Sequence, residues 1–392
     1  FRVYTGASTE LFSIDEAGLA TFNDGIVIGS GTSIRRSTES NHLGLYGGLD
    51  NSGSQDGYIL IHGNANGYGK IHANYGYNTA NSVMTFGIAD NTLITFNGSG
   101  NIAATSFNGI PFFTDVANNS MYTHDVSGTD NNAVQNTAYG FSAMEDITTG
   151  DYNTAIGYNS SANFTTGTQN VSIGAYALGL AVTAASNVAI GYGAMSNADG
   201  EESKNVAVGH SALSGMNSST DNYNTAVGYH AGLSVSTGVR NTLIGGLAGD
   251  AINTGTRNVA VGYNALSTED AGSYNTAIGY NALTVHDAGD AYNVAVGYNA
   301  GAAVTTGVKN NLFGGEAGDA LTTGNNNIAI GYGALGAEDT GSRNVAIGQS
   351  ALSSLNFNGN GYNIAIGHNA GLNLLTGTQN TIIGAQAGDA LT

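Results

Sequence analysis

A short pattern of apolar and polar residues recurs along the last two thirds of the chain. It reads Asn, then usually Val, Thr or Ile, then a small residue, then Ile, Val or an aromatic residue, then Gly. The pattern occurs fifteen times between Asn136 and the end, and ten of the fourteen intervals between successive Asn residues are 17 residues long. Self-similarity at a fixed short period is typical of a solenoid. The chain therefore predicts stacked coils of about 17 residues.

The apolar positions of each repeat predict a short strand. With the repeat Asn as position 1, positions 2 and 4 share one face of a strand and position 3 lies on the other. Position 4 is large, whereas position 3 is Ala in eleven copies. We expect the large face to fill the inside of the coil and the Ala face to approach another backbone. The full coil is predicted as strand, tight corner, second short strand and turn.

Two invariant positions are the candidate structural residues. Asn at position 1 tolerates left-handed backbone and bonds to its own turn, and stacked coils would align the amides in a ladder. Gly at position 5 permits positive φ or close packing at a corner. The residues singled out are Asn136, Asn153, Asn187, Asn258 and Asn344, with Gly157, Gly191, Gly262 and Gly348.

A slower period overlies the short one. The segment 245–251 returns at 314–320 and, with Ala385 replacing a Gly, at 384–390, which is every four repeats. Duplication of a four-coil block explains this better than a binding site in every fourth coil.

Two other solenoids were weighed and are disfavoured. The segment 278–282 fits the hexapeptide of left-handed β-helix acyltransferases, but that fold needs three hexapeptides per coil and this chain has one. The segment 245–250 misses the spacing of the calcium-binding Gly-Gly-x-Gly-x-Asp nonapeptide.

Composition narrows the classes of function. The net charge is −19 with nine Lys and Arg residues, which disfavours binding to nucleic acid or to an anionic membrane surface. The chain has no Cys and one Pro, which excludes disulfides and disfavours collagen. No apolar stretch is long enough to predict a transmembrane helix, and we expect no membrane insertion.

The repeats resemble those of known surface proteins. Residues 187–191 (Asn-Val-Ala-Ile-Gly) and 344–348 resemble the head repeats of YadA-type trimeric autotransporter adhesins. The longer form at 275–283 resembles bacteriophage tail-fibre proteins even more closely. The resemblance implies an all-β chain with a left-handed β-roll of about 17-residue coils, packed or intertwined as a parallel homotrimer. The adhesin period is commonly shorter.

The first 135 residues support the tail-fibre resemblance. Residues 11–23 and 93–108 both read as strand, Gly-containing turn and strand, like hairpins of phage fibre shafts. We predict a shaft-type hairpin in 1–30 and a small antiparallel β domain with a closing shaft hairpin in 31–109. A connector in 110–135 and the fifteen-coil region 136–392 follow. Strands are expected at 43–46 and 58–61.

Two surface columns are the candidate contacts. Position 6 is often Tyr, and stacked aromatics that stabilise a solenoid face are the default interpretation. Exposed aromatics also bind sugars, so the candidate receptor contacts are Tyr192, Tyr263, Tyr280, Tyr298 and Tyr332. Five basic residues each directly precede a repeat Asn and predict a solvated column near acids such as Asp270 and Asp339. The three longest insertions, 196–204, 214–223 and 353–362, are expected to bulge and to carry specificity.

The histidines predict no catalytic or metal site. His62 and His72 flank a Gly-rich loop and are most simply polar surface, and His210 and His368 substitute for Tyr at position 6. No catalytic, cofactor or metal constellation stands out, so we expect no enzyme and no cofactor.

The resemblance implies a virion structural protein. It would be a trimeric tail or side fibre, a rigid spacer for host attachment, with other tail or baseplate proteins and a host-cell receptor as partners. The alternative is a bacterial cell-surface adhesin head that binds host matrix or other cells. We expect more protein after Thr392, such as a tip or a self-cleaving chaperone domain. We also expect the position-3 residues Ala189, Ala260 and Ala346 near the threefold axis.

Overall fold

The structure is a computed structural model of the chain. It describes residues 2–5, 9–14, 20–22, 83–88, 91–97, 102–104, 106–107, 110–111, 113–115, 120–123 and 132–392 apart from 219. Every regular element in these ranges is a β-strand. No helix among the described residues is long and apolar enough to cross a membrane.

The N-terminal strands form short antiparallel sheets in two separate units, 1–78 and 79–392. In the first unit, β1 (Arg2–Thr5), β2 (Thr9–Ile14) and β3 (Ala20–Phe22) pair in chain order. In the second unit, β4 (Val83–Ile88), β5 (Asn91–Asn97) and β6 (Ile102–Ala104) do the same. A two-stranded sheet joins β7 (Ser106–Phe107) to β8 (Ile110–Pro111).

Both predicted hairpins are confirmed. The β2–β3 pair covers the first, with Phe12 opposite Phe22, and the β5–β6 pair covers the second, with Ile94 opposite Ala104. The strands expected at 43–46 and 58–61, together with His62 and His72, lie outside the described residues.

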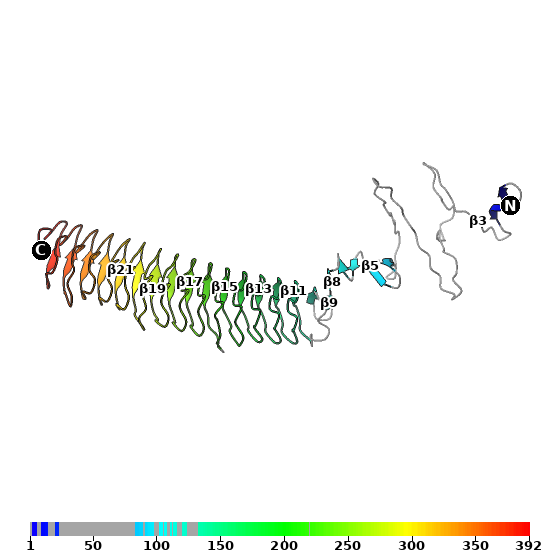
Figure 1. Cartoon of the computed structure of the whole chain (residues 1–392), viewed down its shortest axis with the longest axis horizontal. Coiled ribbons are helices and arrows are strands. Elements are labelled where there is room, and N and C mark those ends of the chain that lie inside the picture. The colour runs from blue at the N-terminus through cyan, green and yellow to red at the C-terminus, as the bar shows by residue number, and fades with distance from the viewer. Residues whose placement is uncertain are drawn as a thin grey trace. The chain divides into compact units, whose positions relative to one another are not determined.

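A β-solenoid occupies the rest of the second unit. After β9 (Phe113–Asp115), sixteen parallel strands stack side by side in chain order from β10 to β25, as the ribbon shows (Figure 1). The strands are β10 (Ser120–Tyr122), β11 (Thr137–Tyr139), β12 (Thr154–Ile156), β13 (Val171–Ile173), β14 (Val188–Ile190), β15 (Val206–Val208), β16 (Thr225–Val227), β17 (Thr242–Ile244), β18 (Val259–Val261), β19 (Thr276–Ile278), β20 (Val294–Val296), β21 (Asn311–Phe313), β22 (Ile328–Ile330), β23 (Val345–Ile347), β24 (Ile364–Ile366) and β25 (Thr381–Ile383).

The parallel ladder begins earlier than the first repeat Asn. β10 lies in the segment predicted as a connector, pairs antiparallel with β9 and pairs parallel with β11. The Ser120 hydroxyl accepts the Asn136 backbone N–H at 3.0 Å, which is the contact that an Asn amide oxygen makes in later coils. Ser120 therefore begins the side-chain ladder.

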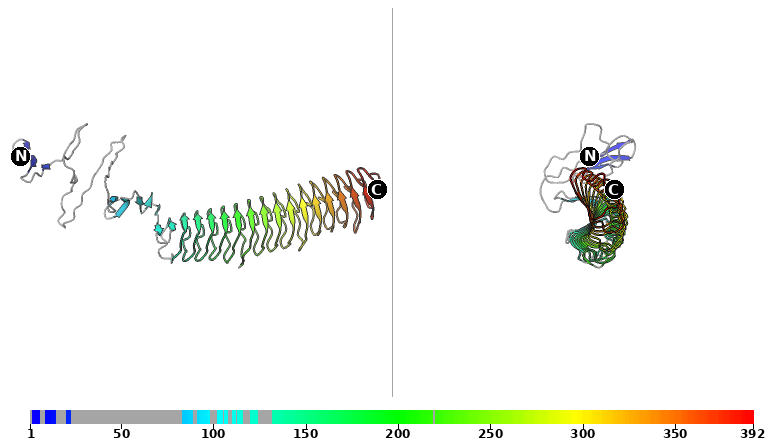
Figure 2. Two further views of the ribbon diagram at one scale, coloured as in Figure 1. Left: turned by 180° about the vertical axis from the view of Figure 1, so that it is seen from behind. Right: turned by 90° about the vertical axis from the view of Figure 1, so that its left-hand side faces the viewer.

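The two strand faces point opposite to the prediction. The position-3 side chain is buried in every coil, with Ala155 and Ala260 fully inaccessible, whereas Ile156 at position 4 is 38% exposed. In the view from the end of the stack, the ribbons of successive coils overlie one another (Figure 2). The interior is filled by larger side chains from the opposite wall, such as Leu178 and Leu266. Ala is the residue that leaves room for them. The predicted place of Ala189, Ala260 and Ala346 at a threefold axis is therefore wrong.

In the described coils, turns take the place of the second strand that the sequence predicts. The return wall consists of turns in which positions 7 and 9 adopt left-handed backbone, as at Asn264 (φ 54°) and Leu266 (φ 53°). Successive walls still bond, for example from Leu266 N–H to the Ala282 carbonyl at 3.0 Å. Since left-handed residues interrupt the extended backbone, each coil has one regular three-residue strand.

The position-5 glycines act as the sequence predicts. Gly262 has φ 136°, and a Cβ built there would lie 2.3 Å from the Gly279 carbonyl oxygen of the next coil. Gly157, Gly191 and Gly348 have the same conformation, and each lies similarly close to the backbone of the position-5 Gly in the next coil. Only Gly combines this φ with this approach.

The four-coil period has a physical explanation in the core. Position 3 is Leu243, Leu312 or Ile382 in every fourth coil, and position 9 of that coil is then Gly249, Gly318 or Gly388. A Cβ on Gly249 would lie 2.7 Å from Leu243 Cδ2, so the large side chain takes the space that Leu or Met at position 9 fills in eight of the fifteen coils. One large position-3 side chain therefore fills space beside the position-9 glycines of two successive coils, as Leu243 does for Gly232 and Gly249.

Candidate binding surfaces and the buried polar core

The repeat asparagines form a continuous buried ladder. Asn258 is typical: its Nδ2 donates to the Gly272 carbonyl at 2.8 Å, and its Oδ1 accepts the backbone N–H of Asn275 at 2.9 Å. The same pattern recurs along the stack, so the predicted ladder is confirmed. The left-handed residue is the one before the Asn, such as Arg257 with φ 57°, and the expectation that the Asn itself takes this conformation is wrong.

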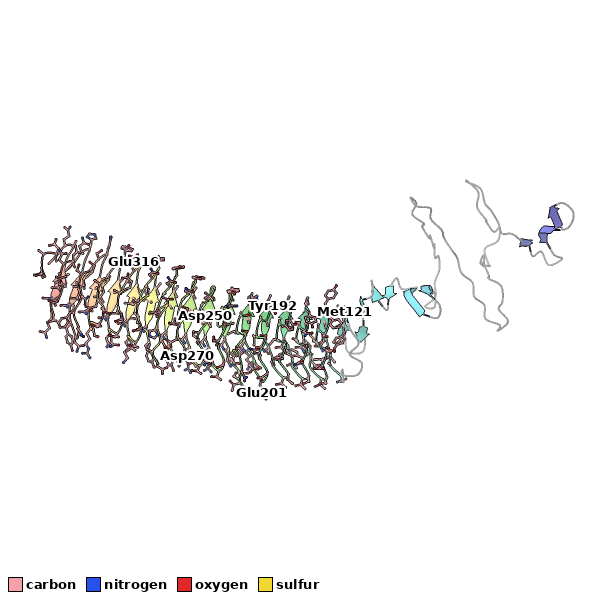
Figure 3. The ribbon with its side chains drawn as sticks, viewed as in Figure 1. Met121, Tyr192, Glu201, Asp250, Asp270 and Glu316 are labelled. Atoms are coloured by element: carbon pink, nitrogen blue, oxygen red, sulfur yellow. The ribbon has the colours of Figure 1, made fainter. Side chains whose placement is uncertain are left out.

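The predicted tyrosines form an exposed column. Tyr192, Tyr263, Tyr280, Tyr298 and Tyr332 are each 47–56% exposed. The rings of Tyr263 and Tyr280 stack at 5.7 Å between centroids, and those of Tyr280 and Tyr298 at 5.6 Å. Figure 3 shows Tyr192 toward one long edge of the solenoid and Asp270 toward the opposite edge. The column offers aromatic faces in runs of successive coils, interrupted at Gly246 and Gly315.

A shallow groove opens beside the start of this column. It has a volume of about 420 Å³ and is lined by Asn159, Asn163, Tyr176, Leu180 and Tyr192 among others. Partial burial and then the neighbouring Tyr158 raise the pKa of Tyr176 above its usual value. His210 stacks on the far side of Tyr192 with centroids 5.1 Å apart, so this histidine belongs to the column as predicted. Aromatic faces next to polar groups suit a sugar ring.

The basic column is present, but the predicted acidic partners are not its contacts. Among the described residues the one Lys or Arg ion pair joins Lys204 to Asp221. Arg257 lies 5.4 Å from the ring centroid of Tyr274, and Arg343 lies 5.5 Å from that of Tyr362. The guanidinium groups therefore stack on tyrosines and keep their charge unneutralised.

Sequence reasoning missed three glutamates in the solenoid core. Glu202, Glu269 and Glu338 are fully inaccessible. Glu269 and Glu338 occupy position 12, which elsewhere holds core residues such as Ile252 or Leu321. Alignment of the repeats at position 12 would have found two of them, because a charged residue stands there in a column of apolar ones.

Each buried carboxylate accepts backbone N–H groups of a turn. Glu269 Oε1 accepts Gly272 N–H at 2.6 Å, and Glu338 Oε1 accepts Gly341 N–H at 2.7 Å. Glu338 Oε2 has no hydrogen-bond partner, and burial raises the pKa of this carboxyl group. A buried polar atom without a partner destabilises the fold, so Glu338 is the weak point of this set.

A buried histidine, His286, contacts the Glu269 carboxylate. His286 Nδ1 lies 2.5 Å from Glu269 Oε2, and His286 Nε2 lies 3.0 Å from Asn293 Nδ2. All three side chains are fully inaccessible. A Glu–His pair can serve acid–base chemistry only where substrate reaches it, so this closed cluster is structural in the described chain.

The three insertions leave the strand register intact. Val206 stays opposite Thr225 across one insertion, and Val345 stays opposite Ile364 across another. The extra residues are therefore accommodated in the turn before the next Asn. No cluster of three or more His, Asp or Glu residues suited to a metal ion occurs among the described residues.

No protein-family model matches the chain, and no curated protein matches it either.

Proposed function

We propose that this chain is the trimeric spacer of a phage tail or side fibre, which holds host-binding elements away from the particle. The observation that carries the proposal is the uninterrupted stack of sixteen parallel strands. At about 4.8 Å per strand such a stack is roughly 70 Å long. Each coil contacts only the coils next to it, and such a stack suits a mechanical role better than a catalytic one.

The outer strand face supports assembly of copies. Position 4 exposes Ile278 by 38%, Phe313 by 40% and Ile330 by 40%, and comparable side chains continue along the ladder. Contiguous apolar surface on this scale is typical of an interaction face. With the Ala row inside the coil, this face of positions 2 and 4 is the surface we assign to the axis of a parallel homotrimer.

Light scattering coupled to size exclusion tests the assembly. We expect a mass three times that of the 39.6 kDa chain. Ile330→Glu places a charge on the proposed interface and should yield folded monomers, since an unpaired charge is costly to bury. Gln349→Glu adds the same charge at exposed position 6 and should leave the trimer intact. A monomeric unmodified chain would refute the proposal.

Electron microscopy tests whether the chain is part of a phage tail. Antibodies against 136–392 should label the tails of phage particles. Labelling of a bacterial surface instead would favour the adhesin head. The tyrosine column and its groove are the surfaces we propose for contact with a host receptor.

A further inference from the structure

The residue before each repeat Asn, which we call position 0, has an unusual composition. It holds all five Lys and Arg residues of 136–392, five Tyr residues, and otherwise only uncharged polar residues. No acid occurs there, although the same segment contains seventeen Asp and Glu residues. The ten Tyr and basic members are Tyr152, Lys204, Tyr223, Arg240, Arg257, Tyr274, Tyr292, Lys309, Arg343 and Tyr362.

Backbone preference does not explain this choice. All fifteen position-0 residues have φ between 51° and 65°, where Gly, Asn and Asp are favoured. Asn occurs there once, as Asn326. Position 7 also lies in the left-handed region in every coil, and there ten of fifteen residues are Asn, Gly or Ser. Tyr and basic residues are therefore held at position 0 against the local conformational preference.

The contacts orient the arginines without neutralising them, whereas Lys204 is paired with Asp221. Arg257 Nη1 donates to the Tyr274 hydroxyl at 2.8 Å, and Arg343 Nη1 donates to the Tyr362 hydroxyl at 2.9 Å. Neither Arg has a carboxylate within ion-pair distance in the described part of the chain. Arg240, Lys309 and Arg343 are exposed as well. Their positive charge is presented to solvent.

The column is also periodic. From Lys204 to Lys309, seven consecutive coils present Lys, Arg or Tyr at position 0. One such side chain follows another at the coil spacing of about 4.8 Å. Tyr274 and Tyr292 stack at 4.8 Å between centroids with an interplanar angle of 7°. A ligand that matches this surface is a linear polymer that repeats anionic groups and flat apolar faces.

We propose that position 0 binds an acidic polysaccharide laid along the solenoid axis. Guanidinium groups bind carboxylate or sulfate through paired hydrogen bonds, and tyrosine rings pack against sugar faces. The proposal gives the class of ligand through which the fibre would attach to its host. It therefore rests on the proposed function as a spacer for host attachment. Nucleic acid shares the charge of such a ligand, and the net charge of −19 opposes either polymer away from the column, so duplex DNA is included as a probe in the test.

Binding to defined polymers tests the proposal with the full chain. The probes are dextran sulfate, polygalacturonate, neutral dextran and duplex DNA, measured by titration at low and at physiological salt. We expect saturable binding to at least one acidic polysaccharide that weakens with salt, and none to neutral dextran. The variant K204Q/R240Q/R257Q/K309Q should bind about tenfold or more weakly.

A matched variant separates the column from net charge. S142D/N264D/S350D/N369D changes the charge by the same four units at position 7, where Asp tolerates the left-handed backbone. It should bind within about twofold of the unmodified chain. Equal loss in both variants, or failure of every acidic polysaccharide to bind, overturns the proposal. Tighter binding to duplex DNA than to every acidic polysaccharide also overturns the proposal. A change of assembly mass in the position-0 variant alone overturns it as well, because the column would then be a contact between copies of the chain. Mass and fibre labelling test the spacer function separately.

Discussion

Removal of one interior ladder amide should destabilise the solenoid strongly. In Asn258→Ala the Gly272 carbonyl loses its donor and the Asn275 N–H loses its acceptor, from bonds of 2.8 and 2.9 Å. The Asn258 backbone keeps its own bond to Asn241 Oδ1. Each buried group left unsatisfied costs about 1–3 kcal/mol, so the free energy of unfolding should fall by about 2–6 kcal/mol.

The same change at Asn380 is the control. Asn380 is half-buried, and its Nδ2 donates to Asn363 Oδ1, which also accepts the Asn380 backbone N–H. Its truncation therefore removes one bond and leaves that acceptor occupied. We expect Asn380→Ala to lower the free energy of unfolding by no more than about 1 kcal/mol.

Two measurements check the magnitude and the location. Urea denaturation gives the change in free energy, provided that the two variants unfold with the same slope. Hydrogen exchange should show faster exchange at the Asn275 amide in Asn258→Ala, because contacts in a solenoid are local. If Asn258→Ala and Asn380→Ala differ by less than about 0.5 kcal/mol, the reasoning from orphaned groups is refuted.

Three further predictions follow from the core. Gly262→Ala should destabilise severely, because its Cβ would lie 2.3 Å from the Gly279 carbonyl oxygen, whereas Gly289→Ala, with nothing within 4 Å, should be neutral in thermal melts. Leu243→Ala should cost about 2–5 kcal/mol, and L243A/G249L should recover part of it by restoring the Ala and Leu arrangement of the following coil, which has Ala260 and Leu266; a double-mutant cycle without coupling would contradict this. Burial raises the pKa of Glu338 above its usual 4.5, so the folded state holds this proton more tightly and stability should fall as the pH rises from that value toward the folded pKa. Glu338→Gln should reduce that fall in denaturation at several pH values, and an unchanged profile would count against it.

The repeat was predictable because its signals are local. Asn at position 1 and Gly at position 5 each meet a requirement of one coil and its neighbour, and the structure places Asn258 and Gly262 as that requirement dictates. The candidate tyrosines were found in the same way, since a shared position in successive coils places them in one column. Exposure of Tyr280 at 47% agrees with its assignment to the surface.

The faces of the strand were not predictable from the strand alone. Alternation shows that positions 3 and 4 point to opposite sides, but both are apolar, so residue type does not say which side is inside. Ala260 lies inside because Leu266 on the opposite wall already fills the narrow interior. That competition for volume involves residues on both walls of the coil, which a reading of one strand omits.

The three buried glutamates lie in coils that directly precede a longer coil. In several coils followed by one of 17 residues, the turn Gly donates to a carbonyl of the next coil, as from Gly255 N–H to the Asp270 carbonyl at 3.3 Å. The coils that carry Glu202, Glu269 and Glu338 are each followed by a coil of 18 or 19 residues. There the turn Gly donates to the carboxylate instead.

An added residue moves the next coil's carbonyl out of register and would leave the turn N–H buried without a partner. A carboxylate on a flexible side chain can reach such a donor where a fixed backbone carbonyl cannot. The desolvation of the charge is offset by these N–H contacts, most completely for Glu202, whose two oxygens accept Gly200 and Ser218 N–H groups at 2.9 and 2.6 Å. The buried acids therefore allow the solenoid to carry longer surface turns without interrupting the strand ladder.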